Sequence, residues 1–127
     1  MTEKKALVVD DEFHIVQVVA IKLRNNGFEV FTADNGMEAY RLACENKPDV
    51  VITDFQMPVM TGLEFVEKLR QNDSTADIPV LMLTARGFDV DEQQRQALKI
   101  THCLSKPFSP REVLQSIEKV LMQQSTL

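Results

Sequence analysis

Five short apolar runs recur along the chain, and each is followed by a longer segment with helical character. The runs occupy residues 6–9, 28–31, 50–52, 80–83 and 102–104. This alternation is typical of successive β-α units, which build a parallel sheet with helices on both faces. The sequence therefore predicts one α/β domain over residues 1–127, with a core of about 5–122 and a short C-terminal tail at 123–127.

The composition of the runs indicates where each strand lies in the sheet. The first, third and fourth runs are continuously apolar, as expected for central parallel strands that are covered on both faces. The second run, Phe28-Glu29-Val30-Phe31, alternates apolar and polar residues like an edge strand. The fifth run, His102-Cys103-Leu104, is the weakest of the set.

Capping signals predict where three of the helices begin. Asn35, Thr61 and Ser109 each precede a glutamate by three residues, which is the pattern of a capping box. In the first helix, the apolar residues Ile15, Val18, Val19 and Leu23 are expected to face the core, with Val16 and Ile21 off this stripe. The largely polar segment 89–98 predicts a helix that is loosely held.

Composition excludes several functional classes. Nineteen acidic residues against fourteen Lys and Arg give a net charge of −5, which disfavours direct contact with nucleic acid. No apolar run approaches the length of a membrane span or a signal peptide, so neither a membrane association nor export is expected. The two cysteines, Cys44 and Cys103, lack metal-ligand spacing, which favours a reduced, cytoplasmic location.

Charged and hydroxyl side chains follow the predicted strands at the points where they end. Asp10, Asp11 and Glu12 follow the first run, Asp54 the third, Thr84 and Ala85 the fourth, and Lys106 the fifth. Ligands of such sheets bind beyond these carboxyl ends. Several carboxylates in one place favour a hard divalent cation such as Mg²⁺ or Mn²⁺. A carboxylate beside a metal and a lysine can attack phosphorus, and Asp54 is the expected nucleophile.

The same strand-end segments resemble the receiver domain of two-component response regulators. The resemblance rests on residues 8–12 (VVDDE), 52–62 (ITDFQMPVMTG), 83–85 (LTA) and 104–108 (LSKPF), and it covers essentially the whole chain. It implies a flavodoxin-like (βα)5 three-layer sandwich, doubly wound, with parallel strands in the order 2-1-3-4-5. It also implies that Asp54 is the phosphoacceptor, that Asp11, Asp54 and the backbone carbonyl of Gln56 ligate Mg²⁺, and that Asp10 acts through a coordinated water.

The resemblance extends to the residues that respond to phosphorylation. Thr84 resembles the hydroxyl that moves toward the phosphoryl group, and Lys106, before a cis proline, the lysine that binds it. Ala85 and Arg86, with Gln56, fall among the switch and tuning positions of slow hydrolysis. Cys103 departs from the family, because most receivers have tyrosine or phenylalanine there. The readout is then expected to rest on Thr84 and on movement of the fourth helix.

The resemblance also implies partners. A sensor histidine kinase or a histidine phosphotransfer protein would supply the phosphoryl group. Val16 and Ile21, next to the acidic site, are either ordinary scattered apolar residues of the surface or contacts to that donor. A downstream protein target would read the altered surface, and the domain is expected to be a monomer or a phosphorylation-dependent dimer. On this interpretation the chain is a signalling phosphoacceptor and not an enzyme.

Two other functions stay open. An aspartate-nucleophile, Mg²⁺-dependent phosphohydrolase uses similar strand-end carboxylates, but such enzymes need a second acid two residues after the nucleophile, where this chain has Gln56. A pseudo-receiver that acts only as a protein-binding scaffold is disfavoured because the charged site positions are all filled. Taken alone, Asp10, Asp11 and Glu12 could also be ordinary acids at a helix N-terminus.

Overall fold

One parallel sheet of five strands, in the order β2-β1-β3-β4-β5, forms the centre of the domain. The structure is a computed structural model that describes residues 4–85 and 91–125. The elements are β1 (Lys4–Val9), α1 (Phe13–Arg24), β2 (Phe28–Ala33), α2 (Gly36–Asn46), β3 (Val50–Asp54), α3 (Gly62–Gln71), β4 (Val80–Thr84), α4 (Glu92–Ala97), β5 (His102–Ser105) and α5 (Pro110–Ser125). The predicted flavodoxin-like fold and strand order are therefore confirmed.

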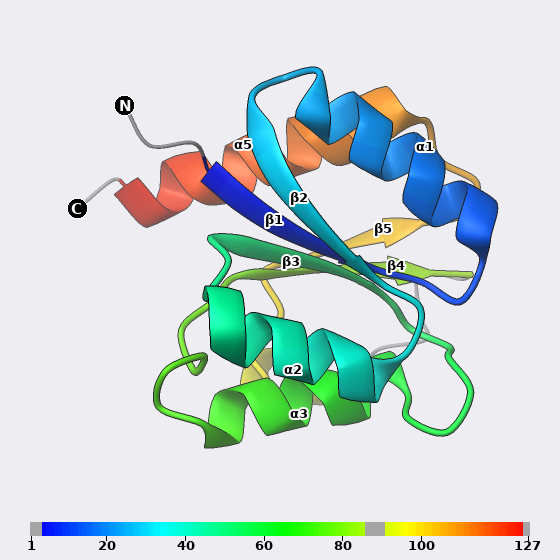
Figure 1. The fold of residues 1–127 in the computed structure, drawn as a ribbon. Coiled ribbons are helices and arrows are strands. Elements are labelled where there is room, and N and C mark those ends of the chain that lie inside the picture. Colours follow the sequence, from blue (N-terminus) through cyan, green and yellow to red (C-terminus); the bar gives the residue numbers. More distant parts are fainter. Residues whose placement is uncertain (1–3, 86–90, 126–127) are drawn as a thin grey trace.

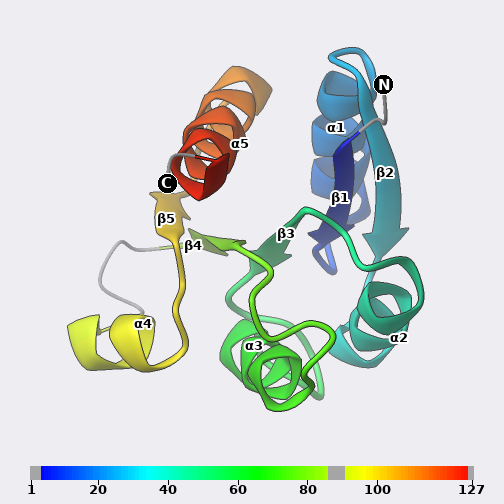
Figure 2. The ribbon, with the colours of Figure 1, turned by 90° about the vertical axis from the view of Figure 1, so that its left-hand side faces the viewer.

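Helices cover both faces of the sheet and make three layers (Figures 1 and 2). Alternate residues of β1 point to opposite faces, because side chains of a strand alternate. Ala6 and Val8 pack with α1 and α5, whereas Leu7 and Val9 pack with α2 and α3. The two hydrophobic cores are thus joined through the backbone of the central strands.

Burial along the strands agrees with their predicted places. Every residue of β3 and β4 is buried, as expected for central strands. β2 lies at one edge of the sheet, where its alternating sequence leaves polar residues partly exposed. The weak fifth run forms β5 at the other edge, and its residues are half-buried or exposed.

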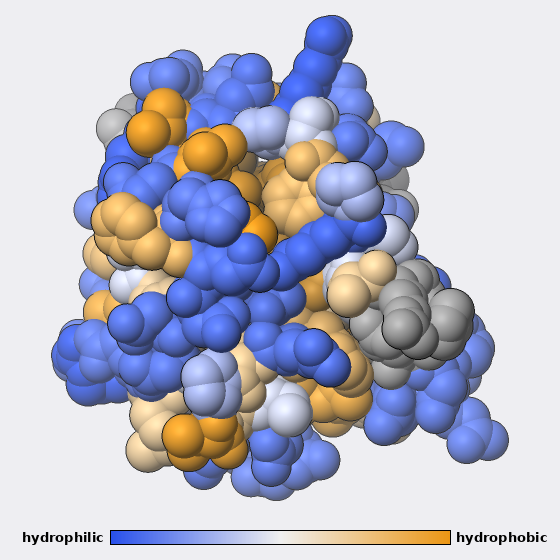
Figure 3. All heavy atoms as spheres, turned by 90° about the vertical axis from the view of Figure 1, so that its right-hand side faces the viewer, coloured by the Kyte–Doolittle hydropathy of each residue, from blue (hydrophilic) through white to orange (hydrophobic). Residues whose placement is uncertain are grey.

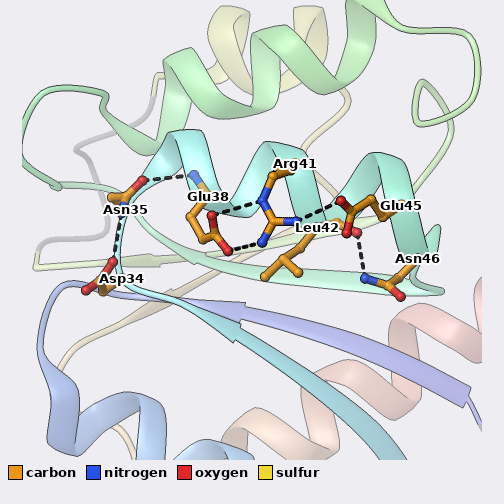
Figure 4. Close-up of polar contacts among 7 residues, drawn as sticks. All are labelled: Asp34, Asn35, Glu38, Arg41, Leu42, Glu45 and Asn46. Atoms are coloured by element: carbon orange, nitrogen blue, oxygen red, sulfur yellow. Dashed lines mark hydrogen bonds and ion pairs between the residues drawn. The ribbon is translucent and has the colours of Figure 1, made fainter.

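The predicted helix caps are present with one difference. Thr61 and Ser109 form complete capping boxes with Glu64 and Glu112. Asn35 accepts a hydrogen bond from the Glu38 backbone, but the Glu38 carboxylate pairs with the Arg41 guanidinium instead of reaching back (Figure 4). A fourth capping box, between Asp91 and Gln94, begins α4 and was not predicted.

The buried face of α1 differs from the predicted one. Val16, Val19, Ala20 and Leu23 are buried, whereas Val18 is 46% and Ile21 53% exposed. The true stripe follows the spacing i, i+3, i+4, i+7 and uses the small side chain of Ala20 against the sheet. The prediction that Val18 is in the core and that Val16 is off the stripe is therefore wrong.

The region around α4 has little side-chain burial of its own. None of the residues Glu92–Ala97 is buried, and the first part of the predicted helix, 89–90, lies outside the described residues. The half-buried Arg70 guanidinium of α3 donates hydrogen bonds to the carbonyls of Leu98 and Lys99, just after α4. At the C-terminus, α5 continues to Ser125, beyond the expected end of the core.

The revised face of α1 predicts opposite behaviour for two neighbouring valines. Val16→Ala is expected to lower the free energy of unfolding by about 1–2 kcal/mol, because it removes buried methyl groups. Val18→Ala is expected to stay within about 0.5 kcal/mol, because that side chain is half exposed. Urea titration of both variants measures the difference. A larger loss of unfolding free energy for Val18→Ala than for Val16→Ala would contradict the observed buried face of α1.

Candidate functional site

The strand-end side chains of four different strands meet at one edge of the sheet. Asp10 follows β1, Asp54 ends β3, Thr84 ends β4 and Lys106 follows β5. These ends all lie on one side because the strands are parallel (Figure 1). The side that faces right in Figure 1 therefore carries the candidate site.

Lys106 is the centre of this group. Its ammonium Nζ lies 3.0 Å from Asp54 Oδ1, 3.4 Å from Asp10 Oδ2 and 3.5 Å from Glu12 Oε1. The Lys106 side chain is one-fifth exposed, whereas Asp10 is fully buried and Asp54 nearly so. A single cation thus contacts carboxylates from two strands and from the start of α1.

Three carboxylates also approach one another closely. Asp10, Asp11 and Asp54 each offer an oxygen atom, and these oxygens lie within 4.8 Å of one another. Asp11 is exposed, so the group has one open side. Carboxylates brought together in this way repel one another unless cations balance them. The group has the oxygen ligands that Mg²⁺ and Mn²⁺ prefer.

Burial and charge shift the pKa values of the central groups. Desolvation raises the pKa of Asp10 to about 6, although a hydrogen bond from the Glu12 backbone and the nearby Lys106 oppose the shift. Desolvation also raises the pKa of Asp54, against the effect of Lys106. For Lys106, burial lowers the pKa, but the hydrogen bond to Asp54 and the charges of the acids outweigh it, and the pKa is raised.

Backbone hydrogen bonds fix the segments that carry these side chains. The Asp10 amide donates to the Ala33 carbonyl at 3.2 Å, and the Glu12 amide donates to Asp10 Oδ1 at 2.9 Å. The Lys106 amide donates to the Thr84 carbonyl at 2.7 Å, which ties the start of the β5–α5 loop to β4. The Lys106–Pro107 peptide bond is cis, as the family resemblance implied.

Three of the predicted switch residues, Thr84, Ala85 and Cys103, belong to β4, to the residue after it and to β5. Thr84 is fully buried, and its hydroxyl has no hydrogen-bond partner within residues 4–85 and 91–125. Cys103 is half-buried opposite Met82, and burial raises the pKa of its thiol. Ala85 is exposed at the site, whereas Arg86 lies outside the described residues.

A cavity of about 350 Å³ opens over the acids. Its lining residues are Asp11, Glu12, Asp54, Gln56, Met57, Pro58, Ala85 and Lys106. Figure 3 shows this edge of the molecule, where hydrophilic residues cross the centre between hydrophobic ones. Met57 and Pro58 were not singled out as lining residues, although they follow Asp54 by only a few positions. The cavity leaves the Asp54 carboxylate accessible to a small anionic group.

The family of the chain follows from its sequence match. The model of the response regulator receiver domain family matches residues 6–118. The chain therefore belongs to the response regulator receiver domain family, whose members are phosphoacceptors in two-component systems.

Relatives that carry the same domain are transcriptional regulators. The chain is 35% identical over 121 residues to the phosphate regulon transcriptional regulatory protein PhoB of Pseudomonas aeruginosa, covering 95% of this chain and 53% of that protein. It is 39% identical over 118 residues to the alkaline phosphatase synthesis transcriptional regulatory protein PhoP of Bacillus subtilis, covering 93% and 48%. The chain thus spans about half the length of these curated relatives.

Solved structures share the fold over nearly their full length. The chemotaxis response regulator CheY4 of Vibrio cholerae matches with a TM-score of 0.87 and 40% identity, covering 94% of this chain and 99% of that one. The receiver domain of the sensor histidine kinase PA1611 of Pseudomonas aeruginosa matches with a TM-score of 0.84 and 23% identity, covering 95% and 99%. That second structure is described with a magnesium ion coordinated in its active-site cleft.

The helices of the domain show no membrane-spanning character. Within the part of the chain that the structure describes, no helix combines the length and the apolar composition needed to cross a bilayer.

The buried charge of Asp10 predicts a pH-dependent stability. Its pKa is about 6 in the folded protein and 3.8 in an ordinary setting, so the folded state binds this proton more tightly. The stability that Asp10 contributes is therefore present below pH 3.8 and is lost as the pH rises to about 6. In EDTA, Asp10→Asn is expected to be more stable than the wild type by about 1–2 kcal/mol at pH 8.

Urea titrations across pH 4–8 test this effect. The advantage of Asp10→Asn should shrink toward pH 4, and Asp73→Asn, at an exposed turn residue, is the control. A variant that is less stable than the wild type at pH 8 would show that the contacts of Asp10 with Lys106 outweigh its desolvation.

Proposed function

We propose that Asp54 accepts a phosphoryl group from the phosphohistidine of a sensor histidine kinase or a histidine phosphotransfer protein. The observation that carries this proposal is the 3.0 Å contact between Lys106 Nζ and Asp54 Oδ1 at the floor of an open, acid-lined cavity. An Asp54 carboxylate oxygen attacks phosphorus, the phosphorus–nitrogen bond breaks, and the imidazole of the donor leaves. The Lys106 ammonium then neutralises oxygens of the transferred group.

The acid group fits a divalent cation. Its three carboxylates lie within reach of one ion, and the single ammonium of Lys106 does not balance their charge. Asp11, Asp54 and the backbone carbonyl of Gln56 would hold Mg²⁺, with Mn²⁺ as a substitute, and Asp10 would act through a coordinated water. When bound, the ion supplies positive charge to the oxygens of the phosphoryl group. The Mg²⁺ described in the PA1611 receiver supports this choice.

The residues around Asp54 favour a signalling role over hydrolysis of a separate substrate. A phosphohydrolase of this type needs a general acid two residues after the nucleophile, and Gln56 has an amide there. The phosphoryl group would instead leave by slow hydrolysis, for which Gln56, which is exposed, and Arg86, which lies outside the described residues, are the tuning positions. A scaffold that is never phosphorylated would have no use for the buried Asp54–Lys106 pair.

A second cavity beside the site suits the approach of a protein donor. It has a volume of about 470 Å³ and shares Glu12, Ala85 and Lys106 with the acid-lined cavity. Its remaining lining is mainly apolar and includes Ile15, Val18, Pro107, Phe108 and Pro110. Val16 is buried and cannot contact a donor, whereas Ile21 remains exposed on the same helix.

The structure around Thr84 supports a readout through α4. The Thr84 hydroxyl has no partner among residues 4–85 and 91–125, and a change of rotamer would let it bond to a phosphoryl oxygen. Cys103 is a small residue that pairs with Met82, two residues before Thr84 on β4, and α4 contributes no buried side chain that would resist movement. The altered surface would then bind a downstream protein or a second copy of the domain.

The central proposal predicts a covalent adduct. Incubation with phosphoramidate and Mg²⁺ is expected to add the mass of one phosphoryl group to the intact protein. Asp54→Asn is expected to abolish the adduct, because an amide cannot serve as the nucleophile. Intact-mass spectrometry checks both proteins, and Asp49→Asn, at a half-buried acid before β3, is the control. An adduct that is formed in EDTA, or that survives Asp54→Asn, would refute the proposed site.

Metal binding predicts a gain in thermal stability. Mg²⁺ binds the folded acid group and not the unfolded chain. At 100 times Kd it is therefore expected to raise the free energy of unfolding by about 2–3 kcal/mol, and so to raise Tm by several degrees. Asp11→Asn should remove most of the shift, since it deletes an exposed ligand of the ion. Calorimetric scans with Mg²⁺ or EDTA measure it. An equal shift in the wild type and in Asp11→Asn would place the ion elsewhere.

A further inference from the structure

We infer that Thr53 and Gly62 are positioning residues that together fix the backbone of Asp54 and so aim its carboxylate. The inference rests on the proposed role of Asp54 as the phosphoacceptor. Neither residue lines the acid-lined cavity, and both are buried beneath it. Both act at the backbone carbonyl oxygen of Asp54: the Thr53 hydroxyl donates a hydrogen bond to it, and Gly62 leaves it the space that a side chain would take.

Thr53 holds this carbonyl through its side chain. Its hydroxyl is fully buried and donates a hydrogen bond to the Asp54 carbonyl at 3.1 Å. Asp54 is the last residue of β3, and the amide of Phe55 makes the final bond to β4, at 2.8 Å from the Leu83 carbonyl. The Thr53 hydroxyl therefore satisfies a buried acceptor at the point where the chain leaves the sheet.

Gly62 lets the start of α3 pack against the same carbonyl. A Cβ atom on Gly62 would lie 2.2 Å from the Asp54 carbonyl oxygen and 3.1 Å from the Phe55 Cα. Real Cβ atoms do not approach backbone that closely, so any side chain here must displace Asp54 or α3. The Gly62 amide also donates to the Phe55 carbonyl at 2.8 Å, which closes the loop between β3 and α3.

The carboxylate of Asp54 depends on this fixed backbone. Its Oδ1 atom lies 3.0 Å from Lys106 Nζ, and one of its two carboxylate oxygens lies within 4.8 Å of oxygens of Asp10 and Asp11. A shift of about 1 Å in a reacting group can cost about a hundredfold in rate. Removing the Thr53 hydroxyl or adding a methyl group at Gly62 should therefore act on the reaction rate beyond any effect on stability.

The chain offers a matched control for each change. Thr53→Ser keeps the hydroxyl that Thr53→Val removes. Gly36 is also crowded, but a Cβ there would meet the Met60 side chain, with 2.6 Å to its sulfur atom, and would not meet the backbone of the phosphoacceptor. A methionine side chain can change rotamer, so Gly36→Ala should be tolerated.

The test uses phosphoramidate with saturating Mg²⁺, at a temperature where circular dichroism shows each variant to be folded. At saturating phosphoramidate, Thr53→Val is expected to label about tenfold more slowly than the wild type, and Thr53→Ser within about twofold of it. Gly62→Ala is expected to label about a hundredfold more slowly, and Gly36→Ala within about threefold. The half-saturating phosphoramidate concentration should change little, since neither substituted residue lines the acid-lined cavity.

Several outcomes would overturn the inference. The inference is wrong if folded Thr53→Val is labelled at the wild-type rate. It is also wrong if Thr53→Ser is labelled as slowly as Thr53→Val. Equal rates for Gly62→Ala and Gly36→Ala would also contradict it. Loss of the folded state in both Thr53→Val and Gly62→Ala would assign these residues to stability alone. A wild type that is never labelled, or labelling that survives Asp54→Asn, would refute the proposed function instead.

Discussion

The contact of Lys106 with buried carboxylates is the interaction on which the candidate site depends. Asp10 and Asp54 are almost fully buried, and burial, together with a neighbouring carboxylate, raises the pKa of both. Their charges are tolerable in the folded protein because the Lys106 ammonium lies between them and Glu12. Since one cation does not balance this group, the free-energy cost is met by the fully buried apolar strands β3 and β4 and by the helices packed on them.

Strand order explains why these residues meet although they are far apart in the chain. β1 lies between β2 and β3, so the chain reverses its direction of winding after β2. The ends of β1 and β3 are therefore adjacent, and the helices that follow them, α1 and α3, pack on opposite faces of the sheet. Asp10 and Asp54 face each other there, and β4 and β5 bring Thr84 and Lys106 to the same edge. The acid-lined cavity is thus a consequence of topology as much as of residue type.

Much of the fold and of the site could be predicted because burial on both faces gives strands an unbroken apolar sequence. The buried face of α1 could not be predicted, because the expected and the observed apolar stripes share Val19 and Leu23. Only packing against the sheet selects the stripe that contains Ala20. The Glu38 side chain had two partners within reach, and the Arg41 guanidinium competes successfully with a backbone amide. From the sequence, Thr53 looks like an ordinary strand residue. Its role depends on the hydrogen bond from its hydroxyl to the Asp54 carbonyl, at the point where the chain leaves the sheet.

The two sides of Asp54 differ in how firmly they are held. On one side, Thr53, the start of α3 and the amide of Phe55 fix the backbone, so the carboxylate has little freedom to move. On the other side, the buried Thr84 hydroxyl lacks a partner among the residues that the structure describes, and α4 beyond it has no buried residue. A group added to Asp54 therefore cannot be accommodated by moving the acceptor. The strain must instead be relieved, and the new hydrogen bonds formed, on the side of β4 and α4. The structural response to phosphorylation is therefore expected on that side.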